Sequence, residues 1–141
     1  MIRVQLRLTD ASRQGQESQA GFHLSTFDIP LAATADIDKD AGLVTFRFKY
    51  PDDETAGPSQ KIDDDISIDI GKNSGKLLAI RVNTKRYTDG RVQVRFPQAI
   101  DAMGQALGKL RNLKAHQREN YELVNALIHE NRQKVENAIS G

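Results

Sequence analysis

Three aspartates near the middle of the chain are spaced like the first ligands of a calcium-binding loop. Asp36, Asp38 and Asp40 alternate with other residues, and in such a loop alternating carboxylates supply the first oxygen ligands. The same loop needs Gly at its sixth position and Glu at its twelfth, but here these positions hold Ala41 and Arg47. The pattern therefore indicates the acidic turn of a hairpin rather than a calcium site.

A second stretch has the composition of a phosphate-binding loop. Residues 71–76 read Gly-Lys-Asn-Ser-Gly-Lys, and glycines beside a lysine can cradle phosphate oxygens. The run is one residue too short, Leu77 stands where Ser or Thr belongs, and the following residues alternate like a strand. These differences favour a tight hairpin turn over a phosphate loop.

Other ligand-type residues do not converge. The three consecutive acids at 63–65 precede a strand and point in different directions, so they predict a solvated strand entry. His23, His116 and His129 lie far apart, which gives neither a metal-ligand spacing nor a base beside a nucleophile. The chain has no cysteine, so disulfides and thiolate chemistry are excluded. We expect no metal, no cofactor and no catalytic residue.

One set of charged residues does predict a function. These residues occupy the outward positions of the predicted strands, and guanidinium groups suit phosphate recognition. They predict a face that binds nucleic acid or another polyanion, whereas the alternative is an ordinary solvated sheet face. No exposed aromatic residues accompany them for base stacking, which argues against single-stranded RNA. The residues are Arg3, Arg7, Arg47, Lys49, Arg81, Arg91 and Arg95.

The elements that would position this face are β-strands. Residues 2–9 alternate apolar and polar side chains, as a half-buried strand does. Residues 22–29 predict an edge or bent strand, because Pro30 follows them. Residues 33–37 and 43–50 predict a hairpin that sets Ile37 opposite Val44 and Ala35 opposite Phe46, with Gly42 at a positive φ. Residues 11–21 and 51–60 read as loops.

Two further hairpins are predicted with three-residue loops that end in glycine. The loop at 73–75 pairs Ile70 with Leu78, Ile68 with Ile80 and Ile66 with Val82, which keeps the apolar faces together. By the same reasoning, a loop at 88–90 pairs Thr84 with Val94 and Val82 with Phe96. The sequence therefore predicts an antiparallel meander of six to seven strands.

The rest of the chain is predicted to be helical. Apolar residues recur at alternating steps of three and four from Ile100 to Ala138, interrupted only at Lys114, Gln117 and Asn131. Pro97 suits a first helical position. A helix over residues 98–140 would run roughly 60 Å, longer than a strand of about 20 Å. One long helix is favoured, and a turn between two antiparallel helices at residues 114–120 is the alternative. The fold class is α+β, with a sheet domain at 1–97 and a helix at 98–141.

A helix that extends past the sheet would leave apolar side chains without a partner. This predicts a non-enzymatic interaction or assembly module that forms a homo-oligomer, as in a coiled coil, or docks on a protein partner through its C-terminal helix. Nucleic-acid or polyanion binding by the basic sheet face is the alternative. The predicted interaction residues are Tyr121, Val124, Leu127, Ile128, Asn131 and Val135.

Overall charge does not point to a partner, because the net charge is +1. Charge is uneven along the chain: residues 51–70 carry seven acids and one base, and residues 71–97 carry seven bases and one acid. No apolar run reaches the length of a membrane span, and the N-terminal residues have no signal-peptide core. We expect a soluble, cytoplasmic protein with no membrane partner.

Residues 36–82 resemble a family of small bacterial domains of unknown function. The resemblance rests on an Asp-containing turn leading into a strand (residues 36–48), an Asp-containing strand (66–70), and a Gly turn with a closing strand (74–82). It covers about a third of the chain and does not include the C-terminal region. It implies a small β-rich fold, with no known activity and no functional residue to carry over.

Overall fold

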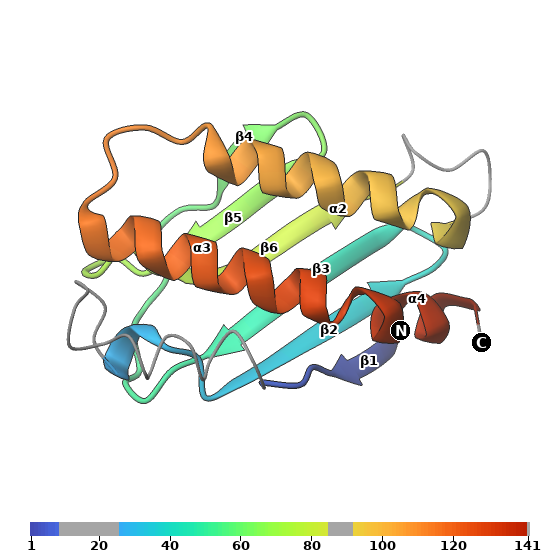
Figure 1. Cartoon of the computed structure of the whole chain (residues 1–141), viewed down its shortest axis with the longest axis horizontal. Coiled ribbons are helices and arrows are strands. Elements are labelled where there is room, and N and C mark those ends of the chain that lie inside the picture. The colour runs from blue at the N-terminus through green and yellow to red at the C-terminus, as the bar shows by residue number, and fades with distance from the viewer. Residues whose placement is uncertain (9–25, 85–91, 141) are drawn as a thin grey trace.

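The computed structural model describes residues 1–8, 26–84 and 92–140 of this chain, without the side chains of residues 26 and 92–95. Within these residues the fold is α+β: a six-stranded antiparallel sheet carries three α-helices on one face (Figure 1). The strands are β1 (Ile2–Gln5), β2 (Ala32–Asp38), β3 (Leu43–Lys49), β4 (Gln60–Asp63), β5 (Ile66–Ile70) and β6 (Leu77–Asn83). The helices are the short 3-10 helix η2 (Thr26–Asp28), α2 (Val92–Gly108), α3 (Ala115–Glu130) and α4 (Arg132–Ser140).

The strands are ordered β1-β2-β3-β6-β5-β4 across the sheet. The predicted simple meander is therefore wrong in one respect: after β3 the chain crosses to the far edge, forms β4, and returns through β5 to place β6 beside β3. β4 was not predicted: the loop expected at 51–60 includes only its first residue, and residues 63–65 were expected to lead into the next strand. Its four residues have little apolar alternation, and only Ile62 is partly buried, so its pairing with β5 comes from tertiary structure rather than from local pattern.

The predicted register of the first hairpin is confirmed. Ile37 pairs with Val44 and Ala35 with Phe46, and Gly42 adopts a φ of 68° in the turn. A left-handed φ of this kind favours glycine because a Cβ atom would clash with the backbone.

The second hairpin is confirmed except at its end. Ile68 pairs with Ile80 and Ile66 with Val82, but Ile70 pairs with Leu77 rather than Leu78 because the ladder shifts by one residue after Asp69. Gly75 has the predicted positive φ, 76°.

Of two other predictions about strands, one is wrong and the other falls largely outside the described residues. Residues 92–96 were predicted to be a strand, but they form the start of α2. Phe96 is fully buried at helical spacing from Ile100 and Met103, so tertiary burial extends the helical seam N-terminally and overrides the local alternation. The turn at 88–90 lies outside the described residues, as do residues 22–25 of the predicted edge strand, and residues 26–28 are η2.

The single long C-terminal helix is wrong, and the chain folds back as the alternative of antiparallel helices expected, but the turn does not lie at 114–120, because residues 115–120 are already part of α3. α2 ends at Gly108, and the chain turns back through residues 109–114, where Asn112 supplies a left-handed φ of 62°. A second break at Asn131 separates α3 from α4. Burying a large apolar side chain contributes about 1.5–3 kcal/mol. A chain that folds back on the sheet is therefore more stable than a straight helix that leaves its C-terminal apolar side chains in water. The predicted domain boundary at 97/98 and Pro97 both lie inside α2.

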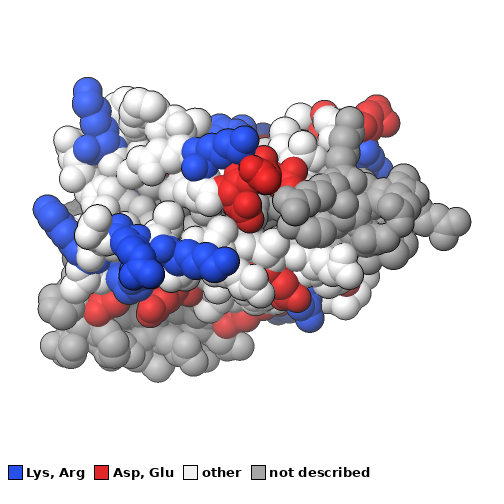
Figure 2. Space-filling view, turned by 90° about the horizontal axis from the view of Figure 1, so that it is seen from above, with Lys and Arg blue, Asp and Glu red and all other residues white. Residues whose placement is uncertain are grey.

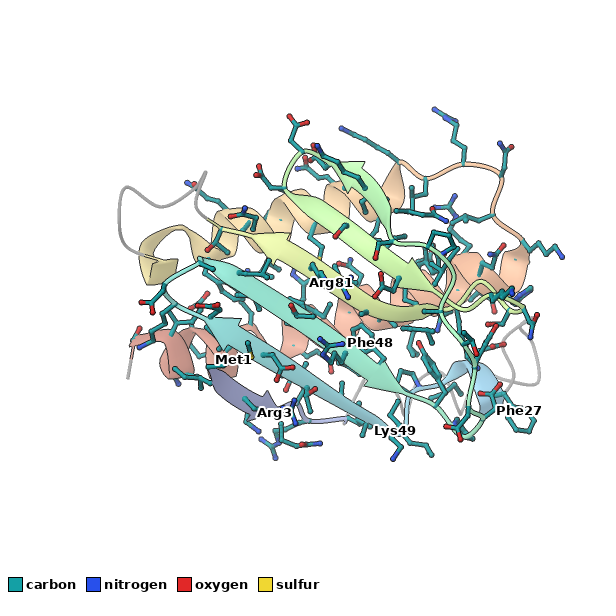
Figure 3. The ribbon with its side chains drawn as sticks, turned by 180° about the vertical axis from the view of Figure 1, so that it is seen from behind. Met1, Arg3, Phe27, Phe48, Lys49 and Arg81 are labelled. Carbon is teal, nitrogen blue, oxygen red and sulfur yellow. The ribbon has the colours of Figure 1, made fainter. Side chains whose placement is uncertain are left out.

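The core lies between the sheet and the helices. On the covered face, two rows of side chains run across the strands, Ile37–Val44–Val82–Ile66 and Ala35–Phe46–Ile80–Ile68. Helix residues such as Ile100, Met103 and Leu127 close over them in the same cluster. The opposite face of the sheet, which we call the open face, has none of the described helices on it (Figure 3). No helix among the described residues is long and apolar enough to cross a membrane.

Candidate anion-binding site

The six predicted interaction residues are part of the chain's own core. Their residues are 0–3% exposed, because α3 folds back over the sheet and α4 continues over β1. The apolar surface that suggested docking through the helix is therefore already covered. Self-association or docking through the C-terminal helix stays a prediction, but these six side chains are not the exposed apolar surface on which it was based. The residues are Tyr121, Val124, Leu127, Ile128, Asn131 and Val135.

Two polar members of that set bind the backbone of the sheet region. The Tyr121 hydroxyl donates to the Gly75 carbonyl at 2.8 Å, and burial raises the pKa of this phenol to about 12. The Asn131 amide accepts a hydrogen bond from the Arg7 N–H at 2.7 Å and donates to the Arg7 carbonyl at 3.0 Å. Asn131 thus pairs with the chain just beyond β1 as a neighbouring strand would, rather than setting the register of a coiled coil.

Three of the predicted basic residues do share the open face, but each has a carboxylate beside it (Figure 3). Asp36 accepts hydrogen bonds from Arg3 at 2.8 Å and from Arg47 at 3.2 Å. Arg81 donates to Asp69 at 2.7 Å. These neighbouring guanidinium groups hold the pKa values of Asp36 and Asp69 below the ordinary value, despite the burial that opposes ionisation.

The predicted basic face is therefore neutralised in part, because Asp36 and Asp69 offset two of the positive charges of Arg3, Arg7, Arg47, Lys49 and Arg81. Cross-strand register explains the pairing, because Arg3 lies opposite Asp36 on the neighbouring strand. Asp36 in turn lies opposite Thr45, and Arg47 is the next residue of β3 on the same face of the sheet. Lys49 and Arg7 are exposed near the same edge. Arg91 lies outside the described residues, and the side chain of Arg95 is not described.

A different group of bases gathers at one end of the molecule. The segment 102–118 contains four bases, one histidine and no acid, and it forms the end of α2, the connection and the start of α3. Figure 2 shows most of the visible lysine and arginine side chains toward the end where this connection lies. We call Lys72, Arg111, Lys114 and Arg118 the basic end.

Among the described residues, no carboxylate is paired with a cation of the basic end. Within the described chain none of the four is ion-paired, and Arg118 donates only to the neutral carbonyl of Leu110 at 2.7 Å. Lys72, Arg111 and Lys114 are exposed. Sequence reasoning missed this cluster because it searched strand faces; the acid-free run at 102–118 was the available signal.

A pocket of about 220 Å³ opens within the basic end, between the β5–β6 hairpin and the start of α3. We call it the hairpin pocket. Its polar lining comes from Lys72, Asn73 and Ser74 on the hairpin and from Lys114, His116 and Gln117 on the other side. None of its nine lining residues is acidic, so it can hold an anion.

The hairpin itself is held from its other side by Glu54. This carboxylate accepts hydrogen bonds from the N–H groups of Asn73 and Ser74, each at 2.6 Å, and from the Ser74 hydroxyl at 2.7 Å. Burial opposes the charge of Glu54, but these hydrogen bonds hold its pKa below the ordinary value. The phosphate-loop-like sequence is thus a hairpin, as predicted, and its backbone donors already bind an internal anion.

Lys76 ties the same hairpin to the preceding loop. Its ammonium is buried, bonds to Asp52 at 2.5 Å and to the Phe27 carbonyl at 2.8 Å, and lies 4.6 Å from the centre of the Tyr50 ring. The contact with Lys76 lowers the pKa of Asp52. Because Lys76 is fully engaged, its role is to fix the fold rather than to meet a ligand.

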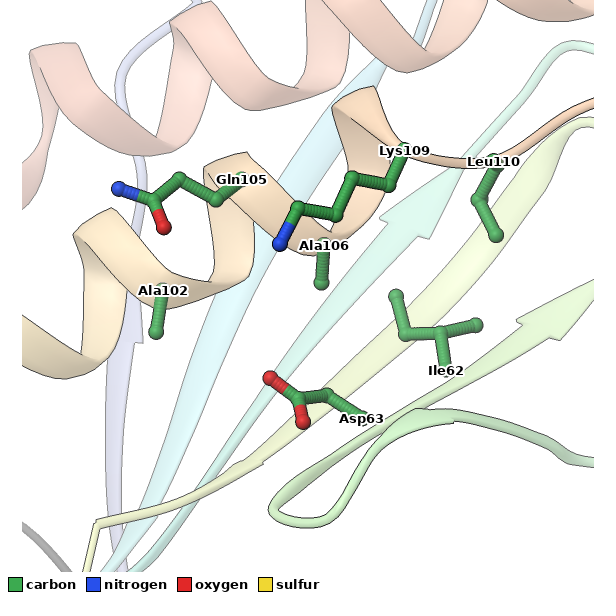
Figure 4. Close-up of a pocket in the computed structure, with 7 residues that line it drawn as sticks. All are labelled: Ile62, Asp63, Ala102, Gln105, Ala106, Lys109 and Leu110. Carbon is green, nitrogen blue, oxygen red and sulfur yellow. The ribbon is translucent and has the colours of Figure 1, made fainter.

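A second pocket of about 240 Å³ lies between β4 and α2 (Figure 4). Lys109 extends from the end of α2 over Ala106 toward Asp63, and Ile62 and Ala102 face the same space. Its two ionisable groups have opposite charges, so it does not extend the anion-binding surface. No group of three or more potential His, Cys, Asp or Glu metal ligands occurs in the described part of the chain.

Comparisons with known proteins assign no family. No protein-family model, curated protein or solved structure matches this chain. The resemblance of residues 36–82 to a family of small bacterial domains stays a prediction, and function must be argued from the residues themselves.

Proposed function

We propose that this protein is a non-enzymatic nucleic-acid-binding protein that contacts the phosphate backbone through its basic end. The observation that carries this proposal is the uncompensated charge of Lys72, Arg111, Lys114 and Arg118. Cations without carboxylate neighbours break no ion pair when they meet a phosphate, whereas paired cations must first give up their partner.

The proposal keeps the predicted polyanion binding but assigns it to the basic end instead of the open face of the sheet. On the open face, contact with a phosphate would compete with Asp36 and Asp69, which already hold three arginines. Beside the hairpin of the basic end, the carboxylates of Asp52 and Glu54 bind Lys76 and the hairpin backbone. Hydrogen bonds within the fold therefore already offset part of the negative charge of these two carboxylates.

Binding of this kind is insensitive to base sequence. The basic end is defined by two lysines and two arginines, and none of these four side chains carries an aromatic ring on which an unpaired base could stack. Each neutralised phosphate releases condensed counterions, so affinity falls steeply with salt. A duplex backbone, with its regular phosphate spacing, is the ligand that suits such a surface.

The proposal is tested by fluorescence anisotropy with a labelled DNA duplex at several salt concentrations. Arg111→Glu with Lys114→Glu should weaken binding at least about tenfold and reduce the salt slope by about 2, because two phosphate contacts are lost. The matched control is Lys39→Glu with Lys134→Glu, which makes the same charge change at exposed sites away from the basic end. An equal loss in the control, or no binding of the unaltered protein at low salt, would overturn the proposal.

A further inference from the structure

We infer that the hairpin pocket binds a phosphate monoester group, such as the terminal phosphate of a nucleic acid. The inference rests on the proposed function and adds a specific seat for one doubly charged group. Its two ionised walls are Lys72 on the hairpin and Lys114 at the start of α3. A monoester carries a charge of about −1.5 to −2 at neutral pH, which two ammonium groups can balance.

The neutral groups of the pocket also present donors. The Gln117 side-chain oxygen accepts the Lys114 N–H at 2.9 Å, which leaves the Gln117 NH₂ as its free donor end. That NH₂ occupies the space that a Cβ on Gly75 would fill, with only 1.9 Å between them. Gly75 therefore makes room for the amide of Gln117, which is one of the residues that line the pocket.

The pocket walls are fixed to one another before any ligand arrives. His116 Nε2 donates to the Ser74 carbonyl at 3.1 Å, and the Tyr121 hydroxyl donates to the Gly75 carbonyl. Glu54 holds the same hairpin from the opposite side through the N–H groups of Asn73 and Ser74. A backbone frame that is fixed before binding loses less entropy when a ligand binds, which favours binding at this pocket.

Size and charge select the ligand. A volume of about 220 Å³ is below the range of about 300–1,000 Å³ typical of drug-sized ligands, and suits a compact group. An internal phosphodiester carries one charge and two free oxygens, whereas a terminal monoester offers three oxygens to donors on both walls. The site therefore favours a chain end over the duplex interior.

The first experiment titrates inorganic phosphate into the ¹⁵N-labelled protein and follows amide chemical shifts. Shifts should concentrate at residues 71–76 and 114–117, and Lys72→Gln with Lys114→Gln should remove them. Lys39→Gln with Lys134→Gln is the matched control and should leave them unchanged. Shifts spread over all exposed lysines, or shifts that persist in the Lys72→Gln, Lys114→Gln protein, would overturn the inference.

The second experiment separates nucleic-acid ends from free phosphate and separates this inference from the proposed function. A labelled oligonucleotide with a 5′-phosphate should bind at least about fivefold more tightly than the same oligonucleotide without it, and Lys72→Gln should abolish the difference. Equal binding of the two would overturn the inference and leave the backbone proposal standing. Phosphate binding in the pocket without any binding of DNA would support the pocket and overturn the nucleic-acid function.

Discussion

The open face of the sheet and the basic end both carry arginines or lysines in close array, but only the open face pairs them. Arg3 and Arg47 share Asp36, and Arg81 binds Asp69, whereas the basic end has no ion pair among its described residues. The difference teaches that the number of bases on a surface does not decide its affinity for anions. What decides it is whether the fold places a carboxylate within reach of each base.

The two regions are also held together differently. On the open face, charged side chains bind one another across strands. Behind the basic end, an uncharged side chain, Asn120, accepts the Leu77 N–H at 2.9 Å and donates to the Asp28 carbonyl at 2.8 Å and to the Tyr50 hydroxyl at 3.1 Å. The structure at the basic end therefore does not depend on its surface charges, which stay available.

The largest effect should come from Asn120→Ala, which removes the uncharged support behind the basic end. It leaves buried backbone groups of Leu77 and Asp28 without partners, and we expect a loss of roughly 3 kcal/mol in the free energy of unfolding. Urea denaturation measures this. Asn137→Ala, at an exposed position of α4, is the control and should change stability by less than about 0.5 kcal/mol. Equal stability of the two variants would contradict the proposed support.

Asp36→Asn should make the open face more like the basic end, because it removes the carboxylate that pairs with Arg3 and Arg47. The neutral amide loses two charge-assisted hydrogen bonds, and because both arginines are more than half exposed we expect a cost of only about 1 kcal/mol. The freed Arg3 and Arg47 should also strengthen DNA binding and steepen its salt dependence. Asp40→Asn, at an exposed site in the neighbouring turn, is the control. Unchanged DNA affinity in Asp36→Asn would show that the carboxylate does not mask the arginines.

Acid should weaken the open face and spare the charges of the basic end. The pKa values of Asp36 and Asp69 are lowered by Arg3 and Arg81, so the unfolded chain binds more protons than the folded chain at low pH. Stability contributed by these pairs is present above the ordinary carboxyl pKa and is lost as pH falls below about 4. Urea midpoints measured from pH 6 to pH 2 should fall less steeply in Asp36→Asn than in the unaltered protein. If the urea midpoints of the two proteins fall equally with pH, Asp36 does not contribute to the acid sensitivity of the fold.

The smallest effect should come from Arg3→Gln with Arg47→Gln. Because these arginines are already bound to Asp36, their loss should change DNA affinity by less than about twofold in the anisotropy assay. The charge-matched comparison is Arg111→Gln with Lys114→Gln at the basic end. A larger loss from the sheet pair than from the basic-end pair would restore the sheet face as the anion-binding surface.

The local parts of the fold could be predicted from the sequence. Hairpin registers followed from apolar alternation and from Gly42 and Gly75, because a one-residue slip would turn every side chain to the wrong face. The helix break could not be placed in the same way, since its left-handed position is held by Asn112 and not by glycine, and only a minority of asparagines adopt a positive φ. The helical start at Val92 required knowing that Phe96 would be buried against the sheet.

The sequence predicted a basic surface that binds anions, but it placed that surface on the sheet and not at the basic end. Arginines on the open face were found from strand parity, but Asp36 was assigned to a turn and Asp69 to a strand without reference to the bases beside them. Pairing between Arg3 and Asp36 joins residues 33 positions apart, and no local pattern carries that information. The hairpin pocket likewise joins residues 72 and 114, which only the folded-back helix brings together.

The bond between Asn131 and Arg7 links residues 124 positions apart. During synthesis the first strand leaves the ribosome long before the side chain that completes its edge has been made. The sheet edge at β1 must therefore wait, unsatisfied, until almost the whole chain is available, and contacts this distant in sequence slow folding. Closure of this edge should be a late event in biogenesis, and the nascent protein is exposed to edge-to-edge pairing until then.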